Sequence, residues 1–227
     1  MEPTLYRVRM DWDAYATTQV SRYEDGEARL SLEPDARQKQ LVRMAMAAGG
    51  VGLARLMEGR PGDAAAWLTR SAERYRESFV GAPPESWGRP VGAVKARLLA
   101  GDGEGAAADA SWALAAGAAV SASPIGRYAG ALAHLVLGAD QEAAVTAGSL
   151  QREAPDAFPA PVADALAALA ARDSPAYDVA VRAVLRSFEE REAYLEDAAV
   201  ADTVLVLQAL AKPRVLAVTL SSLLLPP

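Results

Sequence analysis

The chain contains a single histidine, His134, and no cysteine, so few of its residues are suited to acid–base or nucleophilic chemistry. Without cysteine there is no thiolate nucleophile, no thiolate metal site and no disulfide. Histidine suits proton transfer near neutral pH, but His134 lies within the apolar run Ala131–Leu137. We therefore expect His134 to pack in the interior or to line a groove, and we expect no catalytic residue.

A cluster of carboxylates late in the chain is a candidate metal site. Its members are Glu189, Glu190, Glu192, Glu196 and Asp197. Residues three and four apart share a helix face, so several of these carboxylates could approach one cation. However, di-iron helical bundles require a Glu-x-x-His element, which this chain lacks, and Arg186 and Arg191 lie among the acids. A solvated, salt-bridged face is therefore favoured, and we expect no metal.

Two glycine-rich segments have the composition of ligand-binding loops. The first, Gly49–Gly52, follows a helical run rather than a strand and has no Lys-Ser or Lys-Thr after it, which argues against a phosphate loop. The second, Gly101–Gly105, lacks the terminal Glu of a calcium loop, so a turn between helices explains it better. No serine lies in a Gly-x-Ser-x-Gly elbow. We expect no cofactor and no enzymatic activity.

Four similar tetrapeptides divide the chain into repeating units. They are Leu53-Ala54-Arg55-Leu56, Lys95-Ala96-Arg97-Leu98, Leu132-Ala133-His134-Leu135 and Leu166-Ala167-Ala168-Leu169. Each ends an apolar helical run and is followed by a turn and another helix-forming segment. Recurrence at intervals of 42, 37 and 34 residues predicts an all-α fold of stacked antiparallel helix pairs. We expect an α-solenoid of about ten helices with a tetratricopeptide-like layout.

Proline, glycine and capping residues predict the boundaries. We expect one domain over residues 1–227, with an irregular N-terminal cap (1–35), helix pairs (36–212) and a C-terminal tail (213–227). The cap is predicted to hold a short strand at Leu5, Tyr6 and Val8 and a helix at 11–23. Further helices are expected at 36–56, kinked or interrupted by Gly49–Gly52, and at 63–79, 86–100, 105–117, 124–138, 141–153, 158–172, 174–195 and 198–212.

Two helix caps and the packing of the tail are also predicted. Asp63 and either Asp173 or Ser174 can each accept a hydrogen bond from a free amide at a helix start. The tail from Val215 to Leu225 is apolar enough to pack onto the helices.

Composition limits the classes of partner. A formal net charge of -6 and a pI near 5.0 disfavour nonspecific nucleic-acid binding, which needs dense positive charge. The longest strongly apolar stretches, 203–211 and 215–225, are shorter than the ~20 residues of a membrane span. The first ten residues lack the apolar run of a signal peptide. Together with the absence of cysteine, these features predict a soluble cytoplasmic protein that binds neither nucleic acid nor membranes.

Charge is distributed unequally between the two helices of each predicted pair. The first helices (37–58, 86–100, 124–138, 158–172 and 198–212) contain ten Lys or Arg residues and three Asp or Glu residues. Because one set of helices lines the inner surface of a solenoid, this segregation predicts a basic groove for an acidic partner. The predicted groove residues are Arg43, Arg55, Arg89, Lys95, Arg97 and Arg127. Alternatively, positive charge near helix C-termini serves the helix dipole.

Three segments of the C-terminal third carry a family resemblance. They are Tyr177 to Tyr194, which ends in Phe188-Glu-Glu-Arg-Glu-Ala-Tyr194, then Val200 to Leu207, and Ser221 to Pro226. This part of the chain resembles the ending of immunity-protein family forty-nine. The resemblance implies an all-α bacterial protein that neutralises a cognate toxin and has no catalytic residues. The segments 53–66 and 132–144 also resemble tetratricopeptide-type repeats in layout, without their full aromatic and proline signature.

These observations favour a non-enzymatic helical-repeat protein that binds a protein partner through a groove. An immunity protein would bind one toxin tightly, whereas a general peptide-binding adaptor would bind peptides or helices more weakly. A small-molecule-binding or enzymatic helical domain is the least favoured class. The identity of the partner, an acidic toxin or peptide, and the oligomeric state stay open at this point.

Overall fold

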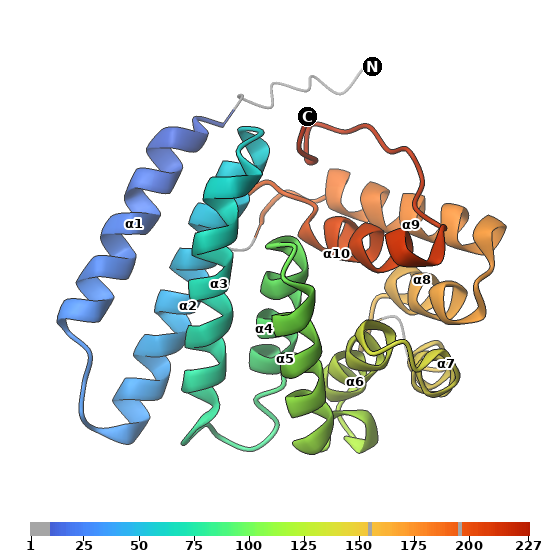
Figure 1. The fold of residues 1–227 in the computed structure, drawn as a ribbon, viewed down its shortest axis with the longest axis horizontal. Coiled ribbons are helices and arrows are strands. Elements are labelled where there is room, and N and C mark those ends of the chain that lie inside the picture. Colours follow the sequence, from blue (N-terminus) through green and yellow to red (C-terminus); the bar gives the residue numbers. More distant parts are fainter. Residues whose placement is uncertain (1–9, 154–155, 195–196) are drawn as a thin grey trace.

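A computed structural model of the chain describes residues 10–153, 156–194 and 197–227 (Figure 1). In these residues it contains ten α-helices, short 3₁₀ helices and no β-strand, which confirms the predicted all-α class. The α-helices are α1 (Trp12–Ala28), α2 (Pro34–Met57), α3 (Pro61–Phe79), α4 (Gly88–Leu99), α5 (Gly103–Ala115), α6 (Pro124–Val136), α7 (Asp140–Leu150), α8 (Ala160–Ala171), α9 (Ser174–Glu189) and α10 (Asp202–Ala211), and the 3₁₀ helices are η1 (Ala118–Val120) and η3 (Lys212–Arg214).

From α1 to α9, each helix packs against the next helix in the sequence. Figure 1 shows the result as a curved array in which successive helices run back and forth. The four tetrapeptides lie near the C-terminal ends of α2, α4, α6 and α8. Each tetrapeptide therefore marks the first helix of a pair, as the sequence predicts.

The last helix closes the array instead of extending it. Helix α10 packs against α4, α8 and α9, which brings the end of the chain back to its middle (Figure 1). Helix α6 contacts both α4 and α8. The first helices α4, α6 and α8 therefore lie side by side, and α10 packs against α4 and α8.

The C-terminal tail packs onto the helices, as its apolar sequence predicts. Leu216 and Leu224 are buried. The backbone N–H of Ala201 donates a hydrogen bond to the carbonyl of Leu224 at 2.9 Å, immediately before α10. The tail thereby helps to fix the start of the helix that closes the array.

Aspartate side chains determine where three helices begin. Asp11, Asp102 and Asp173 each accept a hydrogen bond from an amide in the first turn of the following helix, at 3.0, 2.8 and 3.0 Å. The predicted cap at Asp173 is therefore confirmed. The predicted cap at Asp63 is wrong, because α3 already begins at Pro61. Proline is favoured at the first helical position, where its missing N–H costs nothing.

The glycines at 49–52 do not interrupt α2, which runs unbroken from Pro34 to Met57. They instead allow close helix packing. A Cβ atom added to Gly50 would lie 2.8 Å from the hydroxyl oxygen of Tyr15 on α1, and one added to Gly52 would lie 2.5 Å from Cγ of Leu68 on α3. The predicted interruption is wrong because neighbouring helices, rather than a turn, require glycine here.

The described part of the predicted N-terminal cap, from residue 10 onward, contains the helix expected at 11–23. That helix is α1, which has 17 residues, and the cap also contains the start of α2 at Pro34. The predicted strand at Leu5, Tyr6 and Val8 lies outside the described residues.

Helices α9 and α10 are both shorter than their predicted ranges. Helix α9 ends at Glu189, and α10 begins only at Asp202. Successive acids at Glu189 and Glu190 oppose the negative end of the helix dipole, which favours ending α9 there. The described part of the connection is non-helical apart from a 3₁₀ residue at Asp197, and it contributes to the site described next.

Candidate functional site

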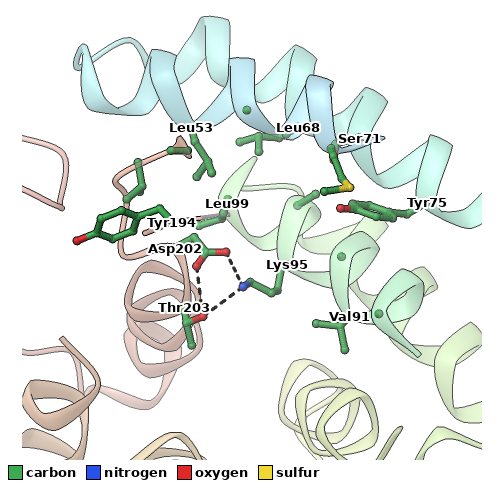
Figure 2. Close-up of a pocket in the computed structure, with 18 of the residues that line it drawn as sticks. Leu53, Leu68, Ser71, Tyr75, Val91, Lys95, Leu99, Tyr194, Asp202 and Thr203 are labelled. Carbon is green, nitrogen blue, oxygen red and sulfur yellow. Dashed lines mark hydrogen bonds and ion pairs between the residues drawn. The ribbon is translucent and has the colours of Figure 1, made fainter. Parts of the chain in front are cut away.

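A cavity of about 370 Å³ lies where α10 returns to α4 (Figure 2). Its walls come from α1 to α4, from the end of α9, from the connection after α9 and from the start of α10. Apolar side chains form much of the lining, among them Leu53, Leu68, Val91 and Leu99. The volume lies near the lower end of the roughly 300–1,000 Å³ that is usual for small-molecule sites.

A polar cluster crosses the cavity between α4 and α10. Lys95 Nζ donates to Asp202 Oδ2 at 2.5 Å and to Thr203 Oγ1 at 3.2 Å. Figure 2 shows Lys95 extending from α4 toward both residues, with Leu53 and Leu68 on the side of α2 and α3. The side chains of Lys95 and Asp202 keep 17% and 31% of their exposure. The pair is therefore largely shielded from water.

Lys95 stays charged in this setting. Burial is the largest single influence and would by itself lower the pKa of the Lys95 ammonium. The charge of Asp202, the hydrogen bond to it and the nearby Tyr128 and Tyr75 together outweigh burial, so the pKa lies above the ordinary 10.5. A lysine nucleophile or base needs the opposite shift, toward neutral pH. The arrangement therefore favours holding a charge pair over transferring protons.

A second cation, Arg191, lies at the rim of the cavity. It lines the cavity although it is exposed, and its Cζ lies 3.6 Å from the ring centroid of Phe188. Tyr194 fixes the same connection by donating from its hydroxyl to the carbonyl of Phe188 at 2.8 Å. Within the described residues, no carboxylate forms a salt bridge with Arg191.

Two glycines of α4 shape one wall. A Cβ added to Gly92 would lie 2.6 Å from the ring of Tyr75, so the ring packs directly against the backbone of α4. A Cβ added to Gly88 would meet no atom within 4 Å. The cavity wall is therefore tightly packed at Gly92 and open at Gly88.

The six predicted groove residues lie on α2, α4 and α6, the first helices of their pairs, but only Lys95 lines the cavity. Arg55 forms an ion pair with Glu58 at 2.7 Å. Arg97 pairs with Asp102 at 2.9 Å and with Asp109, which is 2% exposed, at 3.3 Å. These guanidinium groups are held by acids of this chain.

Two further predicted residues are also engaged within the fold. Arg89 donates hydrogen bonds to the Gln38 side chain and to the carbonyl of Ser78, and burial lowers its pKa. Arg127 pairs with Glu153.

Arg43 differs from the other five predicted groove residues. Its side chain is exposed, and it makes no salt bridge within the part of the chain that the structure describes. A basic partner-binding face stays a prediction, but most of its charges have partners inside the molecule.

The other candidates for chemistry lie elsewhere. His134 is half-buried on α6, where burial lowers its pKa below the ordinary 6.5 and the charge of Glu142 partly offsets that effect. Gly101–Gly105 spans the turn between α4 and α5 and the start of α5, as expected. No group of three or more His, Asp or Glu residues in the described ranges is placed to hold a metal ion.

The predicted acidic face is only partly described. Glu189, Glu190, Glu192 and Asp197 are exposed, and Glu196 lies outside the described residues. Glu189 accepts a hydrogen bond from the Ser222 hydroxyl at 2.7 Å.

Sequence reasoning missed most of the polar residues in the cavity. Asp202 and Thr203 are 107 and 108 residues from Lys95, and no local pattern indicates their contact. Arg191 was assigned to a salt-bridged acidic face, whereas the structure places it over Phe188. The predicted helix at 198–212 has no second helix to complete its pair. This could have suggested that α10 folds back onto the array.

Comparison of the chain with known proteins gives no relative from which a function could be transferred. No family model, no curated protein and no solved structure matches it. Within the described ranges, no helix combines the length and apolar character that crossing a membrane requires.

Proposed function

We propose that this chain is a non-enzymatic helical-repeat binding protein that recognises a partner protein through the cavity between α2, α4 and α10. The observation that carries the proposal is the Lys95–Asp202–Thr203 cluster inside an otherwise largely apolar cavity. Binding sites typically combine apolar walls with a few placed polar groups. Helical arrays commonly bind partners on the surface formed by one set of their helices, and this cavity is lined by the first helices α2 and α4 together with α10.

A binding role agrees better with the state of the ionisable groups than catalysis does. The pKa of Lys95 is raised, so its amine remains protonated and paired with Asp202. A residue in that state anchors or orients a bound group, whereas nucleophilic or general-base catalysis needs a free amine.

The proposal extends to the nature of the partner. The segments that resemble immunity-protein family forty-nine include Phe188, Arg191, Tyr194, Asp202 and Thr203, all of which line the cavity. On this proposal the partner is a bacterial toxin and the protein acts in the cytoplasm, in keeping with the absence of cysteine. A general adaptor for peptides is the alternative, and it would bind several partners more weakly.

Gly88 provides a test that leaves the fold intact. Gly88 is the first residue of α4 and lines the cavity, and a side chain there meets no neighbouring atom at its Cβ. Gly88→Phe should therefore obstruct the cavity. The matched control is Gly103→Phe, at the first residue of α5, where a Cβ also meets nothing within 4 Å and which is outside the cavity lining.

The experiment is affinity capture from the native host with the wild-type protein and both variants, followed by mass spectrometry. The proposal expects a partner that is captured by the wild type and by Gly103→Phe and is lost with Gly88→Phe. A single stoichiometric partner supports the immunity interpretation, and several weak partners support an adaptor. Equal capture by all three proteins would show that the partner binds elsewhere.

A further inference from the structure

The charges that line the cavity are not balanced. Its charged lining residues, within the described ranges, are Lys95, Arg191 and Asp202. Lys95 and Asp202 compensate each other through a contact of 2.5 Å. The positive charge of Arg191 remains, without a salt bridge to any described carboxylate. The site therefore favours a ligand with one negative charge.

Contact with Phe188 orients Arg191 for such a ligand. The guanidinium carbon lies 3.6 Å from the ring centroid, so the ring covers one face of the group. Phe188 is itself only 5% exposed, so its ring is held in place against the guanidinium. The N–H groups at the edge of a stacked guanidinium remain available to donate hydrogen bonds. Two parallel N–H donors match the two oxygens of a carboxylate.

The rest of the cavity suits an apolar part of the ligand. Leu53, Leu68, Val91 and Leu99 contribute to the lining beyond the charged residues. A small inorganic anion would leave this apolar surface in contact with water. A phosphate group carries up to two negative charges at neutral pH, which exceeds the single unbalanced cation.

We infer that the cavity binds a carboxylate joined to a compact apolar group, with Arg191 receiving the carboxylate and the α2–α4 wall receiving the apolar group. This inference rests on the proposed function, since it names the chemistry of the group that the same cavity recognises. On the proposed function the group is the C-terminal residue of a partner chain. A free carboxylic acid has the same chemistry, and finding it to be the ligand would count against partner binding in this cavity.

The probe is 3-phenylpropionate, compared with 3-phenylpropionamide, which has the same shape without the charge. Binding is followed by NMR chemical-shift titration of the full-length protein. Ligands of this size bind with dissociation constants on the order of millimolar. A charge-assisted hydrogen bond to Arg191 should make the acid bind about tenfold more tightly than the amide.

Two charge variants separate a specific role of Arg191 from a general electrostatic effect. Arg191→Gln should weaken binding of the acid about tenfold and leave binding of the amide unchanged. Arg186→Gln removes the same charge from an exposed position of α9 outside the cavity lining, and binding should not change. Both variants should unfold within about 4 °C of the wild type, because both side chains are exposed and Arg191 loses only its contact with Phe188.

A second pair of probes distinguishes the two sources of the ligand. Acetyl-Ala-Ala-Phe with a free carboxylate should bind more tightly than 3-phenylpropionate if the ligand is a chain end, and its C-terminal amide should bind weakly. If the tripeptide acid binds more weakly than 3-phenylpropionate, the ligand is a free carboxylic acid.

The inference is overturned if acid and amide bind equally, if neither shifts resonances of the cavity, or if Arg191→Gln binds the acid as the wild type does. Those results would leave the proposed function intact as long as Gly88→Phe still abolishes partner capture and Gly103→Phe does not. Equal capture by both glycine variants would instead remove the proposed function.

Discussion

Lys95 and Asp202 are separated by 107 residues in the sequence, yet Lys95 Nζ lies 2.5 Å from Asp202 Oδ2. Their ion pair joins α4 to α10 at the contact that closes the helical array. Both side chains are mostly shielded from water, so the loss of one partner leaves an uncompensated charge. The pair therefore links the closure of the fold to the cavity beside it.

Replacing one member of this pair should lower the free energy of unfolding. Replacing both should lower it by less than the sum of the two single changes. We expect Lys95→Met and Asp202→Leu each to lower the free energy of unfolding by about 2 kcal/mol, since the pair is intermediate between exposed and fully buried. The loss in the double variant should be about 1–2 kcal/mol smaller than the sum of the two single losses, because the two residues interact. Urea denaturation measures these changes.

An exposed lysine provides the control for that cycle. Lys39 Nζ lies 2.8 Å from Asp35 Oδ2, but both side chains are more than half exposed. Lys39→Met should change the free energy of unfolding by less than ~0.5 kcal/mol. Strictly additive effects at Lys95 and Asp202 would contradict a closing role for their ion pair.

The predicted groove arginines should differ in their tolerance to charge reversal. Arg97 is 15% exposed and contacts Asp102 and Asp109, so Arg97→Glu brings a third carboxylate to two others and should cost about 3 kcal/mol. Arg43→Glu, at an exposed site, should cost less than ~0.5 kcal/mol. Thermal and chemical denaturation test this difference. Equal tolerance would show that the Arg97 contacts contribute little to stability.

Close backbone packing makes one glycine sensitive to a single methyl group. A Cβ at Gly130 on α6 would lie 2.6 Å from Cα of Ala119 in η1, and backbone atoms have little freedom to move. Gly130→Ala should lower the free energy of unfolding by about 2 kcal/mol. Gly103→Ala, where no atom lies within 4 Å of the Cβ, should instead raise it by about 0.5 kcal/mol. A neutral result at Gly130 would mean that α6 and η1 are further apart.

His134 should produce a pH dependence of stability in the weakly acidic range. Burial lowers its pKa below 6.5 in the folded state, so the unfolded chain binds more protons there. Stability should therefore fall as pH decreases from about 7 toward 5. Because His134 is the only histidine, His134→Gln should flatten this dependence. Thermal unfolding at several pH values checks both statements, and a wild-type midpoint that rises toward pH 5 would contradict the direction of the shift.

The helical architecture could be predicted because its signals are local. The apolar runs that end at Leu56, Leu98, Leu135 and Leu169 each belong to one helix, and the cap at Asp173 depends on a residue three positions away. The wrong prediction at Asp63 also has a local cause. Pro61 and Asp63 are both suitable residues for a helix start, and α3 begins at the proline.

The candidate site could not be predicted because it depends on contacts between distant helices. The composition of the first helices indicated that they are more basic than the rest of the chain. It did not indicate that Arg97 would form an ion pair with Asp109, or Lys95 with Asp202. The glycines of α2 have a similar explanation. Their role depends on Tyr15 and Leu68 in neighbouring helices, so a turn and a packing surface look alike in the sequence.

Hydrogen–deuterium exchange of the complex with the captured partner shows whether the partner binds at the cavity where α10 meets α4. Amide exchange should slow in residues 46–53, 88–99, 188–194 and 198–203, which supply most of the cavity lining, compared with the free protein. A second, more open groove lies between α8 and α9, and half of its lining residues are alanine. Protection confined to residues 160–183 around that groove, with unchanged exchange at 88–99, would show that the partner binds at the second groove and not at the cavity.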